Sequence, residues 1–302
     1  MTSVAVVAHA RKRLGGGLTE LRTVLSAEGV TDPLWYEVPK SKKVAEPLRD
    51  ALEKGADLVI LWGGDGMVQR SVDVLAGTNV TIGIVPAGTA NLLATNLGIP
   101  QDIPQAVRIA LHGARRRLDL GTLNGERFAV MAGAGFDALM IRDVSRGMKE
   151  RVGQLAYIWA GARHLSEPAA RVRIKVDGTK WFEGEASCVL VANVGKIIGG
   201  IAAFKEARPD DGRLELGVVT ATGLADWART MGRAAVGQPD RSPFVQTTSG
   251  REFDVKSDRK LVCEVDGGDR KPTKRFRIQI EPGAVEIAVP EPSEERSEGE
   301  QR

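Results

Sequence analysis

Two glycine-rich segments of this 302-residue chain have the residue types and the spacing for phosphate chemistry. Gly63-Gly64-Asp65-Gly66, followed by Met67, comes directly after the apolar run Leu58–Trp62 and before a helical pattern. Gly88 and Thr89 lie in the second segment. A strand, a glycine turn and a helix aim backbone N–H groups and a helix N-terminus at a phosphate. An ordinary turn between a strand and a helix has the same local pattern, so the rest of the chain must decide between them.

Aspartates supply the other groups that phosphoryl transfer requires, which are ligands for a cation and a base near the attacking hydroxyl. Asp65 could hold Mg²⁺, a hard ion that prefers oxygen ligands. Asp266 could accept a hydroxyl proton if it lies within hydrogen-bond reach. The chain has no GxxxxGKS segment and no HRD or DFG set, which argues against a P-loop enzyme and a protein kinase.

The first 115 residues or so alternate strands with helices, which is typical of a parallel α/β sheet. The expected strands are Val4–Ala8, Leu34–Val38, Leu58–Trp62 and Val80–Val85, and a helix is expected over Pro104–His112. Ligands of such sheets bind beyond the carboxyl ends of the strands. The two glycine loops follow the third and fourth strands, so we expect them to form one shared site.

The pattern changes near Arg115 to many short strands with turn signals, which indicates an antiparallel sandwich or barrel. Two helices, at about Val152–Leu165 and Leu224–Val236, interrupt the strands. The expected strands are Arg117–Thr122, Arg127–Ala132, Ala170–Val176, Glu185–Val191, Arg213–Val219, Glu252–Val255, Leu261–Val265, Phe276–Ile280 and Ala284–Val289.

Composition indicates a globular protein of roughly two domains, with 42% hydrophobic and 27% charged residues. A net charge of +3 is too small to argue for nucleic-acid binding, but it suits an anionic ligand or membrane surface. The run Val4–Ala8 is too short for a signal peptide, and no stretch approaches the ~20 apolar residues of a membrane span. We therefore expect a cytoplasmic protein, with peripheral contact to the inner membrane face left open. Cys188 and Cys263 are expected to be buried and reduced.

The chain resembles the bacterial diacylglycerol kinase-like lipid kinase family. The resemblance begins with the two glycine segments and Leu97-Gly-Ile-Pro100. It continues, in the family's order, through Asp119-Leu-Gly121, Gly133-Ala-Gly-Phe-Asp137, Pro209-Asp-Asp-Gly-Arg-Leu214 and Val265-Asp-Gly267. The resemblance covers nearly the whole chain, to about Pro290. Sphingosine kinases are relatives, and NAD kinase and phosphofructokinase are more distant ones.

The resemblance implies a Rossmann-like α/β domain over residues 1–118 and an antiparallel β-sandwich domain over 119–283, the NAD kinase/diacylglycerol kinase-like fold. It also implies that a last strand, at about 284–289, returns to the first domain. The polar segment 291–302 is expected to be a disordered tail. The implied activity is an ATP- and Mg²⁺-dependent phosphorylation of a diacylglycerol-type hydroxyl, which gives a phosphatidic acid.

The resemblance also assigns roles to residues. Gly63, Gly64, Asp65, Gly66 and Met67 would surround the ATP phosphates, with Gly88 and Thr89 closing the other side. Asp266 would be the general base. Asp211, with the backbone carbonyls of Arg208 and Arg213, would hold a structural magnesium. Asp65 and Asp119 would belong to an acidic network that reaches the catalytic magnesium.

Several positions depart from the family pattern. Met67 replaces a threonine, Gln69 and Arg70 replace an asparagine and a glutamate, and Leu92 replaces an aspartate. Gly268 stands where the family has a glutamate that is itself a candidate base.

These losses leave alternatives open. One is a nucleotide-binding regulator without catalysis, and another is a kinase for a sphingoid base or another lipid alcohol. NAD kinase is disfavoured by the elements around Asp211 and Asp266. Arg11, Lys12 or Lys42 could contact phosphates, His9 could contact nucleotide, and Arg115-Arg-Arg117 could meet anionic lipid, although charge runs are usually solvated. A homodimer is also kept as a hypothesis.

Overall fold

The computed structural model describes residues 3–135, 169–196, 203–235 and 242–291, and in these the chain forms two compact units. Unit 1 comprises residues 1–117 and 285–302, and unit 2 comprises residues 118–284. These divisions lie next to the boundaries expected from the sequence. The helix expected at Val152–Leu165, most of the Gly135–Ala138 element and the tail from 292 lie outside the described residues.

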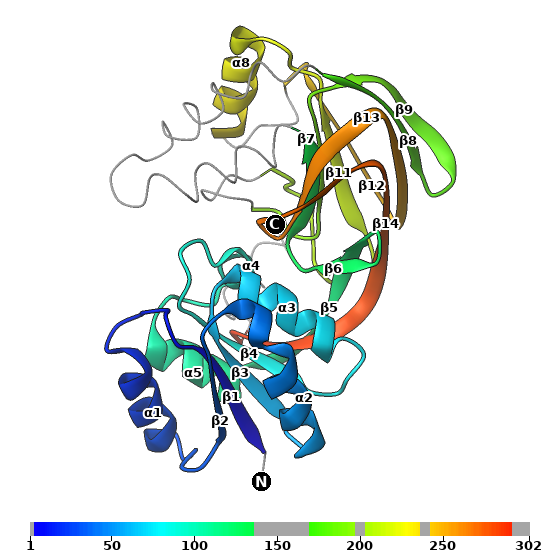
Figure 1. Ribbon diagram of the computed structural model, residues 1–302. Coiled ribbons are helices and arrows are strands. Elements are labelled where there is room, and N and C mark those ends of the chain that lie inside the picture. Colours follow the sequence, from blue (N-terminus) through cyan, green and yellow to red (C-terminus); the bar gives the residue numbers. More distant parts are fainter. Residues whose placement is uncertain (1–2, 136–168, 197–202, 236–241, 292–302) are drawn as a thin grey trace, which may run out of the picture. The chain divides into compact units, whose positions relative to one another are not determined.

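Unit 1 is a parallel sheet with the strand order β2-β1-β3-β4, extended by the end of β14 beside β4. Helices α1 and α5 pack against each other, and so do α2 and α3, on the two faces of the sheet (Figure 1). The elements are β1 (Val4–His9), α1 (Gly17–Ala27), β2 (Leu34–Val38), the short 3₁₀ helix η1 (Ser41–Lys43), α2 (Ala45–Glu53), β3 (Leu58–Gly63), α3 (Asp65–Leu75), β4 (Thr81–Pro86), α4 (Leu92–Asn96) and α5 (Ile103–His112).

The apolar runs of the sequence become the strands of unit 1 because both faces of this sheet are covered. Every residue of β3 and of β4 is buried, as expected for parallel strands between two layers of helices. The helices begin and end at residues that favour those positions. In α5, for example, the Asp102 side chain accepts the N–H of Gln105 at 2.9 Å as an N-cap, and Gly113 ends the helix.

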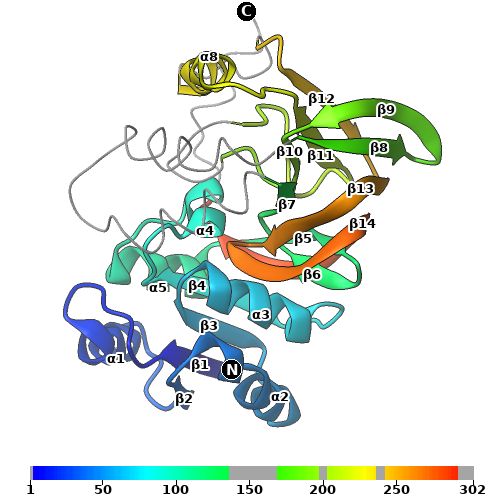
Figure 2. The same cartoon turned by 45° about the horizontal axis from the view of Figure 1, so that its top comes forward.

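Unit 2 is mainly antiparallel, with the strand order β12-β11-β10-β7-β13-β14. Strand β8 pairs with β13 and β9, and β5 pairs with β14 and β6. The elements are β5 (Ala114–Leu123), β6 (Glu126–Phe128), β7 (Met131–Gly135), β8 (Ala170–Val176), β9 (Thr179–Ala186), β10 (Cys188–Ala192), β11 (Leu214–Val219), α8 (Leu224–Ala235), β12 (Val245–Gly250), β13 (Glu252–Val265) and β14 (Gly268–Val289). Figure 2 shows β8 and β9 as a long hairpin.

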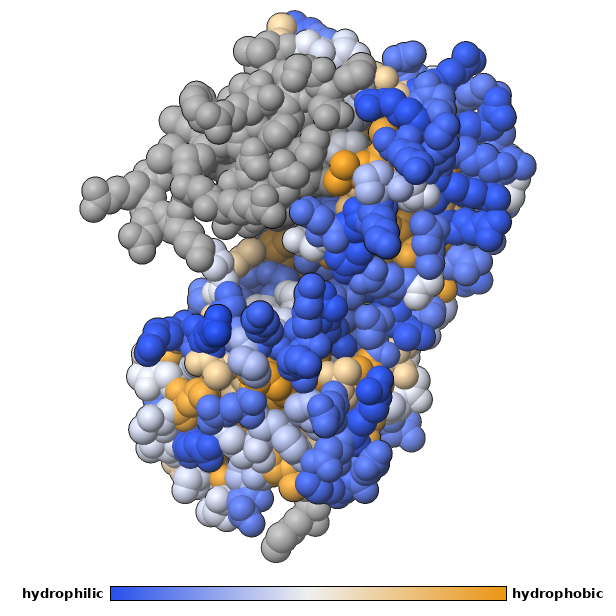
Figure 3. All heavy atoms as spheres, in the orientation of Figure 1, coloured by the Kyte–Doolittle hydropathy of each residue, from blue (hydrophilic) through white to orange (hydrophobic). Residues whose placement is uncertain are grey.

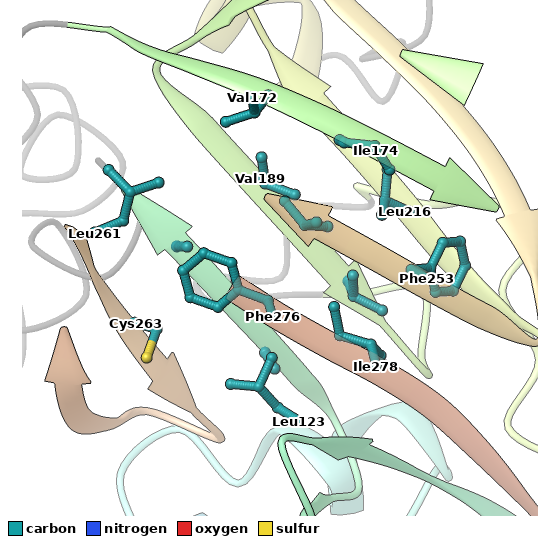
Figure 4. Close-up of a cluster of buried hydrophobic side chains, with 14 of the residues drawn as sticks. Leu123, Val172, Ile174, Val189, Leu216, Phe253, Leu261, Cys263, Phe276 and Ile278 are labelled. Carbon is teal, nitrogen blue, oxygen red and sulfur yellow. The ribbon is translucent and has the colours of Figure 1, made fainter. Parts of the chain in front are cut away.

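The inward side chains of these strands form one core cluster. Phe253 on β13, and Phe276 and Ile278 on β14, point toward Ile174 and Leu216 from other strands (Figure 4). Alternation produces this core, since successive residues of a strand face opposite sides of the sheet. The same alternation places the charged residues of β8, β13 and β14 on the opposite face.

Strand β14 is longer than expected. The sequence predicts separate strands at Phe276–Ile280 and Ala284–Val289, but β14 runs unbroken through Pro282 and Gly283. Its residues Glu286 and Ile287 pair in parallel with β4, and the Thr81 hydroxyl donates to the Glu286 carboxylate at 2.6 Å. The end of the chain's last strand is therefore built into the sheet of unit 1.

The packing of this last strand can be tested at Gly113. A Cβ there would meet the carbonyl oxygens of Val289 and Ile109, which are backbone atoms that cannot move cheaply. We expect Gly113→Ala to lower the free energy of unfolding by about 1–3 kcal/mol in a urea titration, as overpacking does. Gly66→Ala is the control, because a Cβ at Gly66 meets no atom within 4 Å. Equal stability of the two variants would contradict the described position of β14.

Candidate functional site

The two glycine loops lie side by side at the carboxyl ends of β3 and β4. These strands pair in parallel with Gly63 opposite Pro86, and the Ala87 N–H donates to the Gly63 carbonyl at 2.8 Å. Because the strands end in register, the loops leave the sheet together. Both loops therefore lie at one edge of the sheet of unit 1, while the expectation that they form one shared site remains a prediction.

The loops touch through their backbones at Gly64 and Gly88. A Cβ on Gly64 would lie 2.9 Å from the Cα of Gly88, and a Cβ on Gly88 would lie 2.5 Å from the Cα of Gly64. Neither position has space for a side chain, so glycine at both is a steric requirement of this contact. The contact brings bare backbone to the N-terminus of α3.

Asn91 closes the second loop, a role that the sequence motif did not reveal. Its backbone is in the left-handed region at φ 49°, where asparagine is tolerated better than most residues. Its side-chain oxygen accepts the Gly88 N–H at 2.9 Å, and its amide donates to the carbonyls of Gly88 and Pro86 at 3.0 and 3.2 Å. Gln101 also donates to the Gly88 carbonyl, at 3.1 Å. The loop is therefore held in shape without a ligand.

The first turn of α3 is the anion-binding feature of the site. Helix N-termini carry N–H groups without intrahelical acceptors and a partial positive charge. Here the N–H groups of Met67 and Val68 donate back to the Gly64 carbonyl, so the N–H groups before them in the turn are the ones that face a ligand. Gly66 is exposed, and a Cβ on it would meet no atom within 4 Å. Thr89 is exposed at the second loop. This arrangement fits a phosphate group, since the space that a Cβ on Gly66 would fill is empty.

Met67 contributes to the shape of the loop. Its side chain is 1% exposed and packs against Gly63, where a Cβ would meet the Met67 sulfur. It therefore points away from solvent and brings no polar group to the phosphate position. The expectation that Met67 contacts nucleotide remains a prediction.

Asp65 is the carboxylate of the glycine loops. Its Oδ1 accepts the N–H of Leu92 at 2.6 Å, which fixes the start of α4 to the start of α3. Burial raises the pKa of the Asp65 carboxyl, while backbone hydrogen bonds from Leu92 and its neighbours oppose that shift. Several backbone N–H groups therefore act on this carboxylate, that of Leu92 most strongly. A carboxylate is a ligand type that Mg²⁺ accepts, and the role of Asp65 at Mg²⁺ remains a prediction.

Asp119 and Asp266, both in unit 2, are buried acceptors of backbone N–H groups. Asp119 accepts from Gly212 and Gly283, each at 2.7 Å. Asp266 accepts from Ala129 at 2.8 Å, Val130 at 3.0 Å and Met131 at 2.9 Å. Both carboxylates join distant segments of unit 2, and neither is grouped with two other metal-ligand side chains in the described part of the chain. Their proposed roles at magnesium and as base are not tested by this geometry.

Arg270 occupies the space beside Gly268, where the family has a glutamate. A Cβ on Gly268 would lie 2.7 Å from Nη1 of Arg270, and that Nη1 donates to the Gly268 carbonyl at 2.7 Å. The other guanidinium nitrogens bind the carboxylate of Glu126 on β6. The turn after Asp266 is thus covered by an arginine–glutamate pair, which the sequence gave no signal to expect.

The loop of Arg208, Asp211 and Arg213 lies against Asp119, because the Asp119 N–H donates to the Pro209 carbonyl and the Gly212 N–H donates to the Asp119 carboxylate, both at 2.7 Å. Asp211 accepts the Arg213 N–H at 2.9 Å, and Arg208, Asp211 and Arg213 are exposed on and beside the loop before β11. In unit 1, Arg115 donates to the carbonyls of Ala110 and Leu111 at 3.0 and 3.1 Å. That arginine therefore caps α5, which weakens the lipid-contact hypothesis for it.

The first loop of unit 1 is cationic. His9 Nδ1 accepts the Arg11 N–H at 3.2 Å, and burial, followed by the charge of Lys12, lowers the pKa of His9. The lowered pKa favours neutral His9, so the positive charge of this loop comes from Arg11 and Lys12. The nucleotide contact of His9 and the phosphate contacts of Arg11 and Lys12 remain predictions. Cys188 and Cys263 are both buried, and they form no disulfide in the described structure.

Comparisons with known proteins agree with this fold. Residues 10–123 match the family model of the diacylglycerol kinase catalytic domain, and residues 130–289 match that of the YegS C-terminal NAD kinase beta sandwich-like domain. A solved structure of a putative diacylglycerol kinase from Bacillus anthracis str. Sterne has a TM-score of 0.78 at 21% identity, covering 95% of this chain and 97% of that one. An NAD kinase from Archaeoglobus fulgidus in complex with ATP has a TM-score of 0.53 at 13% identity, covering 95% and 93%. The fold is thus that of diacylglycerol and NAD kinases, and the predicted fold class is confirmed.

The curated relatives indicate which family within this fold the chain belongs to. The "Diacylglycerol kinase" of Bacillus subtilis (strain 168) is 32% identical over 227 residues, 72% of this chain and 73% of the relative. A "Probable lipid kinase YegS-like" of Pseudomonas aeruginosa (strain UCBPP-PA14) is 27% identical over 303 residues, 95% and 94% of the two chains. This chain belongs to the bacterial diacylglycerol kinase-like lipid kinase family.

Alanine substitutions at Gly66 and Gly88 can distinguish phosphate binding by the loops from packing between the loops. Gly66→Ala has space for its methyl group, so its free energy of unfolding should stay the same or rise by up to about 1 kcal/mol. Its affinity for ATP, measured by calorimetry, should fall by about tenfold or more, because the methyl group keeps the phosphate from charge-assisted N–H donors. Gly88→Ala should lose both stability and affinity. Unchanged ATP affinity in Gly66→Ala would place the phosphates elsewhere.

The variant Asp65→Asn tests how the Asp65 carboxyl changes the stability of the protein with pH. The ordinary pKa of Asp65 is 3.8, and burial raises it in the folded state. The contribution of Asp65 to the free energy of unfolding is therefore complete below pH 3.8. It is lost as the pH rises through the raised pKa of the folded state. Asparagine keeps an oxygen for the Leu92 N–H but turns an NH₂ group toward the other backbone donors, which costs roughly 1–3 kcal/mol at every pH. Because asparagine does not titrate, the stability of Asp65→Asn relative to the native chain should rise from acid to neutral pH in thermal melts. A difference between the two proteins that stays constant with pH, or falls toward neutral pH, would refute this account of Asp65.

Proposed function

We propose that this protein is an ATP-dependent lipid kinase that transfers the γ-phosphoryl group of ATP to the hydroxyl of diacylglycerol or a similar lipid, which gives phosphatidic acid. The observation that carries the proposal is the Gly64–Gly88 contact beside the N-terminus of α3, in a chain of a lipid kinase family. The names of the relatives support the lipid acceptor, and the fold shared with an ATP-bound NAD kinase supports the nucleotide.

Phosphoryl transfer requires positioning and charge stabilisation more than covalent chemistry. In this proposal the N–H groups of the first turn of α3 bind the phosphates of ATP, and the Gly88–Thr89 segment closes the other side. Asp65 would be the residue of these loops that holds Mg²⁺, since Leu92 brings no second carboxylate. The ion would supply positive charge for the phosphoryl transfer. The carbonyls of Arg208 and Arg213, with Asp211, are proposed for a separate structural magnesium.

Asp266 is proposed as the base that accepts the hydroxyl proton, with a structural duty besides. Three backbone N–H groups already donate to it, and an ionised carboxylate has about four acceptor sites. The carboxylate is thus held rigidly, as a catalytic group requires, but most of its acceptor capacity serves the backbone. Asp119 is proposed to support the acidic network from its position between Gly212 and Gly283.

A nucleotide-binding regulator without catalysis is the second candidate, and one observation favours it. Gly268 brings no carboxylate to the turn after Asp266, and Arg270 occupies the space beside it. Such a protein would bind ATP through the same glycine loops but would phosphorylate no lipid. A sphingoid base or another lipid alcohol is the corresponding alternative for the acceptor.

The test is transfer of labelled phosphate from ATP to a lipid extract, with the product identified by mass spectrometry. We expect a phosphatidic acid from the native chain and a 10²–10⁴-fold slower rate from Asp266→Asn, the usual range for loss of a general base. Asparagine turns an NH₂ group toward backbone donors, which costs roughly 1–3 kcal/mol of stability, so the rates must be compared at a temperature where both proteins are folded. ATP binding without transfer to any lipid would establish the regulator instead.

A further inference from the structure

Asp266 lies at the tip of the hairpin that β13 and β14 form. Val265 and Gly268 pair across the hairpin, so Asp266 and Gly267 are its two-residue loop. Both loop residues have positive φ, 44° and 77°, as the type I′ turn of such hairpins requires, and Asp-Gly is a preferred sequence for that turn. The turn alone would therefore explain these two residue types. It does not explain the contacts that the hairpin makes with the segment from β6 to β7.

Two sets of contacts join the hairpin to that segment. At the loop, the Asp266 carboxylate accepts the N–H groups of residues 129–131, and the Asp266 N–H donates to the Met131 carbonyl at 2.9 Å. Further along β14, Arg270 donates through Nε and Nη2 to the two carboxylate oxygens of Glu126 on β6. The ion pair and the contacts of Asp266 therefore hold the same two parts of the chain together.

Arg270 also binds the hairpin itself. Its Nη1 donates to the carbonyls of Gly268 at 2.7 Å and Asp269 at 3.1 Å. The guanidinium occupies the space beside Gly268, because a Cβ on that residue would lie 2.7 Å from Nη1. Glycine at position 268 is therefore a condition for the place that Arg270 takes against the turn.

The ordinary interpretation of such a pair is a surface ion pair, which usually contributes little. Hydrophilic side chains cover much of unit 2 (Figure 3), and Arg275 with Asp254 on the same hairpin is a pair of this kind, with the arginine side chain 44% exposed. The side chain of Arg270 is only 22% exposed, and its guanidinium binds two backbone carbonyls besides its carboxylate. The Arg270–Glu126 pair is therefore fitted to the shape of the turn.

The charges of Arg270 and Asp266 also act on each other. Hydrogen bonds to Glu126 raise the pKa of Arg270 against the opposite effect of burial, and the charge of Asp266 adds to the rise. A cation thus lies near Asp266 and is paired with a carboxylate that comes from β6. Removal of Glu126 would leave this partly buried cation without its partner, which favours its movement away from the turn.

We propose that Arg270 and Glu126 are a positioning pair, which holds the β13–β14 turn on residues 129–131 and so fixes where the Asp266 carboxylate meets the hydroxyl of the substrate. The proposal rests on the proposed function, in which Asp266 is the base. A base must lie within hydrogen-bond reach of the proton that it accepts, and a displacement of about 1 Å can lower a rate by about 10²-fold. The pair acts through Asp266 and does not itself touch the reacting atoms.

The first test is a double-mutant cycle in the labelled-phosphate assay, with ATP and lipid saturating so that the rate is kcat. Arg270→Gln and Glu126→Gln should each lower kcat by about tenfold or more, while the KM for ATP stays the same. The double variant should be about as slow as the slower single variant, because the two residues act as a unit. Losses that multiply in the double variant, or a native kcat in either single variant, would overturn the proposal.

The matched control is the pair of Arg275 and Asp254. It is a bidentate ion pair on the same two strands, at 2.8 and 2.9 Å, and in the described structure neither side chain bonds to the turn. Arg275→Gln and Asp254→Asn should therefore keep the native kcat. Equal losses of kcat in the two pairs would show a general effect of stability and would contradict a positioning role.

Gly268→Ala moves the guanidinium while both charges remain. Its methyl group would displace Nη1, the far end of a flexible side chain, so the stability should change little. It should nevertheless lower kcat as Arg270→Gln does, because the arginine can no longer lie against the turn. This variant also carries the test if Arg270→Gln does not fold. A native kcat in Gly268→Ala would refute the positioning role.

Amide hydrogen exchange gives a measurement that does not depend on activity. The N–H groups of residues 129–131 should exchange faster in Arg270→Gln than in the native chain or in Arg275→Gln, because the turn that they bind is held less firmly. Faster exchange in a protein that phosphorylates no lipid would support the pair and refute the kinase. Lipid phosphorylation with native kcat and native exchange in Arg270→Gln would support the kinase and refute the pair.

Discussion

The close approach of Gly64 and Gly88 is the constraint on which the site of unit 1 depends. Two neighbouring parallel strands, β3 and β4, end at the same level, so their loops compete for the same space. Both loops can lead into the helices that follow them only because neither loop has a Cβ at the contact. From that contact follow the start of α3, the left-handed Asn91 and the start of α4. The phosphate position is thus a consequence of how two strand ends share one edge.

The aspartates of the motifs have a structural role in addition to any chemical role, because their carboxylates accept hydrogen bonds from backbone N–H groups. Asp65 accepts the Leu92 N–H, Asp119 accepts those of Gly212 and Gly283, and Asp266 accepts three in a row. Charge-assisted hydrogen bonds of this kind are shorter and stronger than neutral ones. An aspartate in such a position fixes the local chain and keeps part of its acceptor capacity for a ligand. Substitution therefore changes the shape of the loop and the chemistry together, and a loss of activity alone does not establish a catalytic role.

Sequence patterns predicted the strands that are buried on both faces and those in which buried and exposed residues alternate regularly. The strands of unit 1 are covered on both faces and read as apolar runs, and β8 alternates so regularly that its bounds, Ala170–Val176, were predicted as observed. Strand β13 was divided in two because Lys256–Lys260 looks like a loop, although Lys256, Asp258 and Lys260 are the exposed residues of a continuous strand. Strand β12 and most of β9 were missed. Their exposed residues need no apolar alternation, since backbone pairing with β11 and β8 holds them.

The same limit applies to the site. Spacing in the sequence predicted the two loops, because each is a local motif followed by a helix. It could not show that Asp266 binds the N–H of Ala129, since 137 residues separate them. It also could not show that Arg270 and Glu126, 144 residues apart, cover the turn beside Gly268. Residues that act through long-range partners become visible only when strand order and register are known.

Surface charge follows this rule as well. Arg115-Arg-Arg117 is the most compact basic run near the domain boundary, yet Arg115 binds the last carbonyls of α5 and Arg117 donates to Asn79 at 3.4 Å. By contrast, Lys256 on β13 lies directly opposite Arg173 on β8 and Arg275 on β14, and these three cations form no run in the sequence. A sheet gathers charge across its strands, at right angles to the sequence, whereas a run along the chain is divided between the two faces of a strand. On a protein with this much sheet, the cations that lie together on one face are therefore found from strand register.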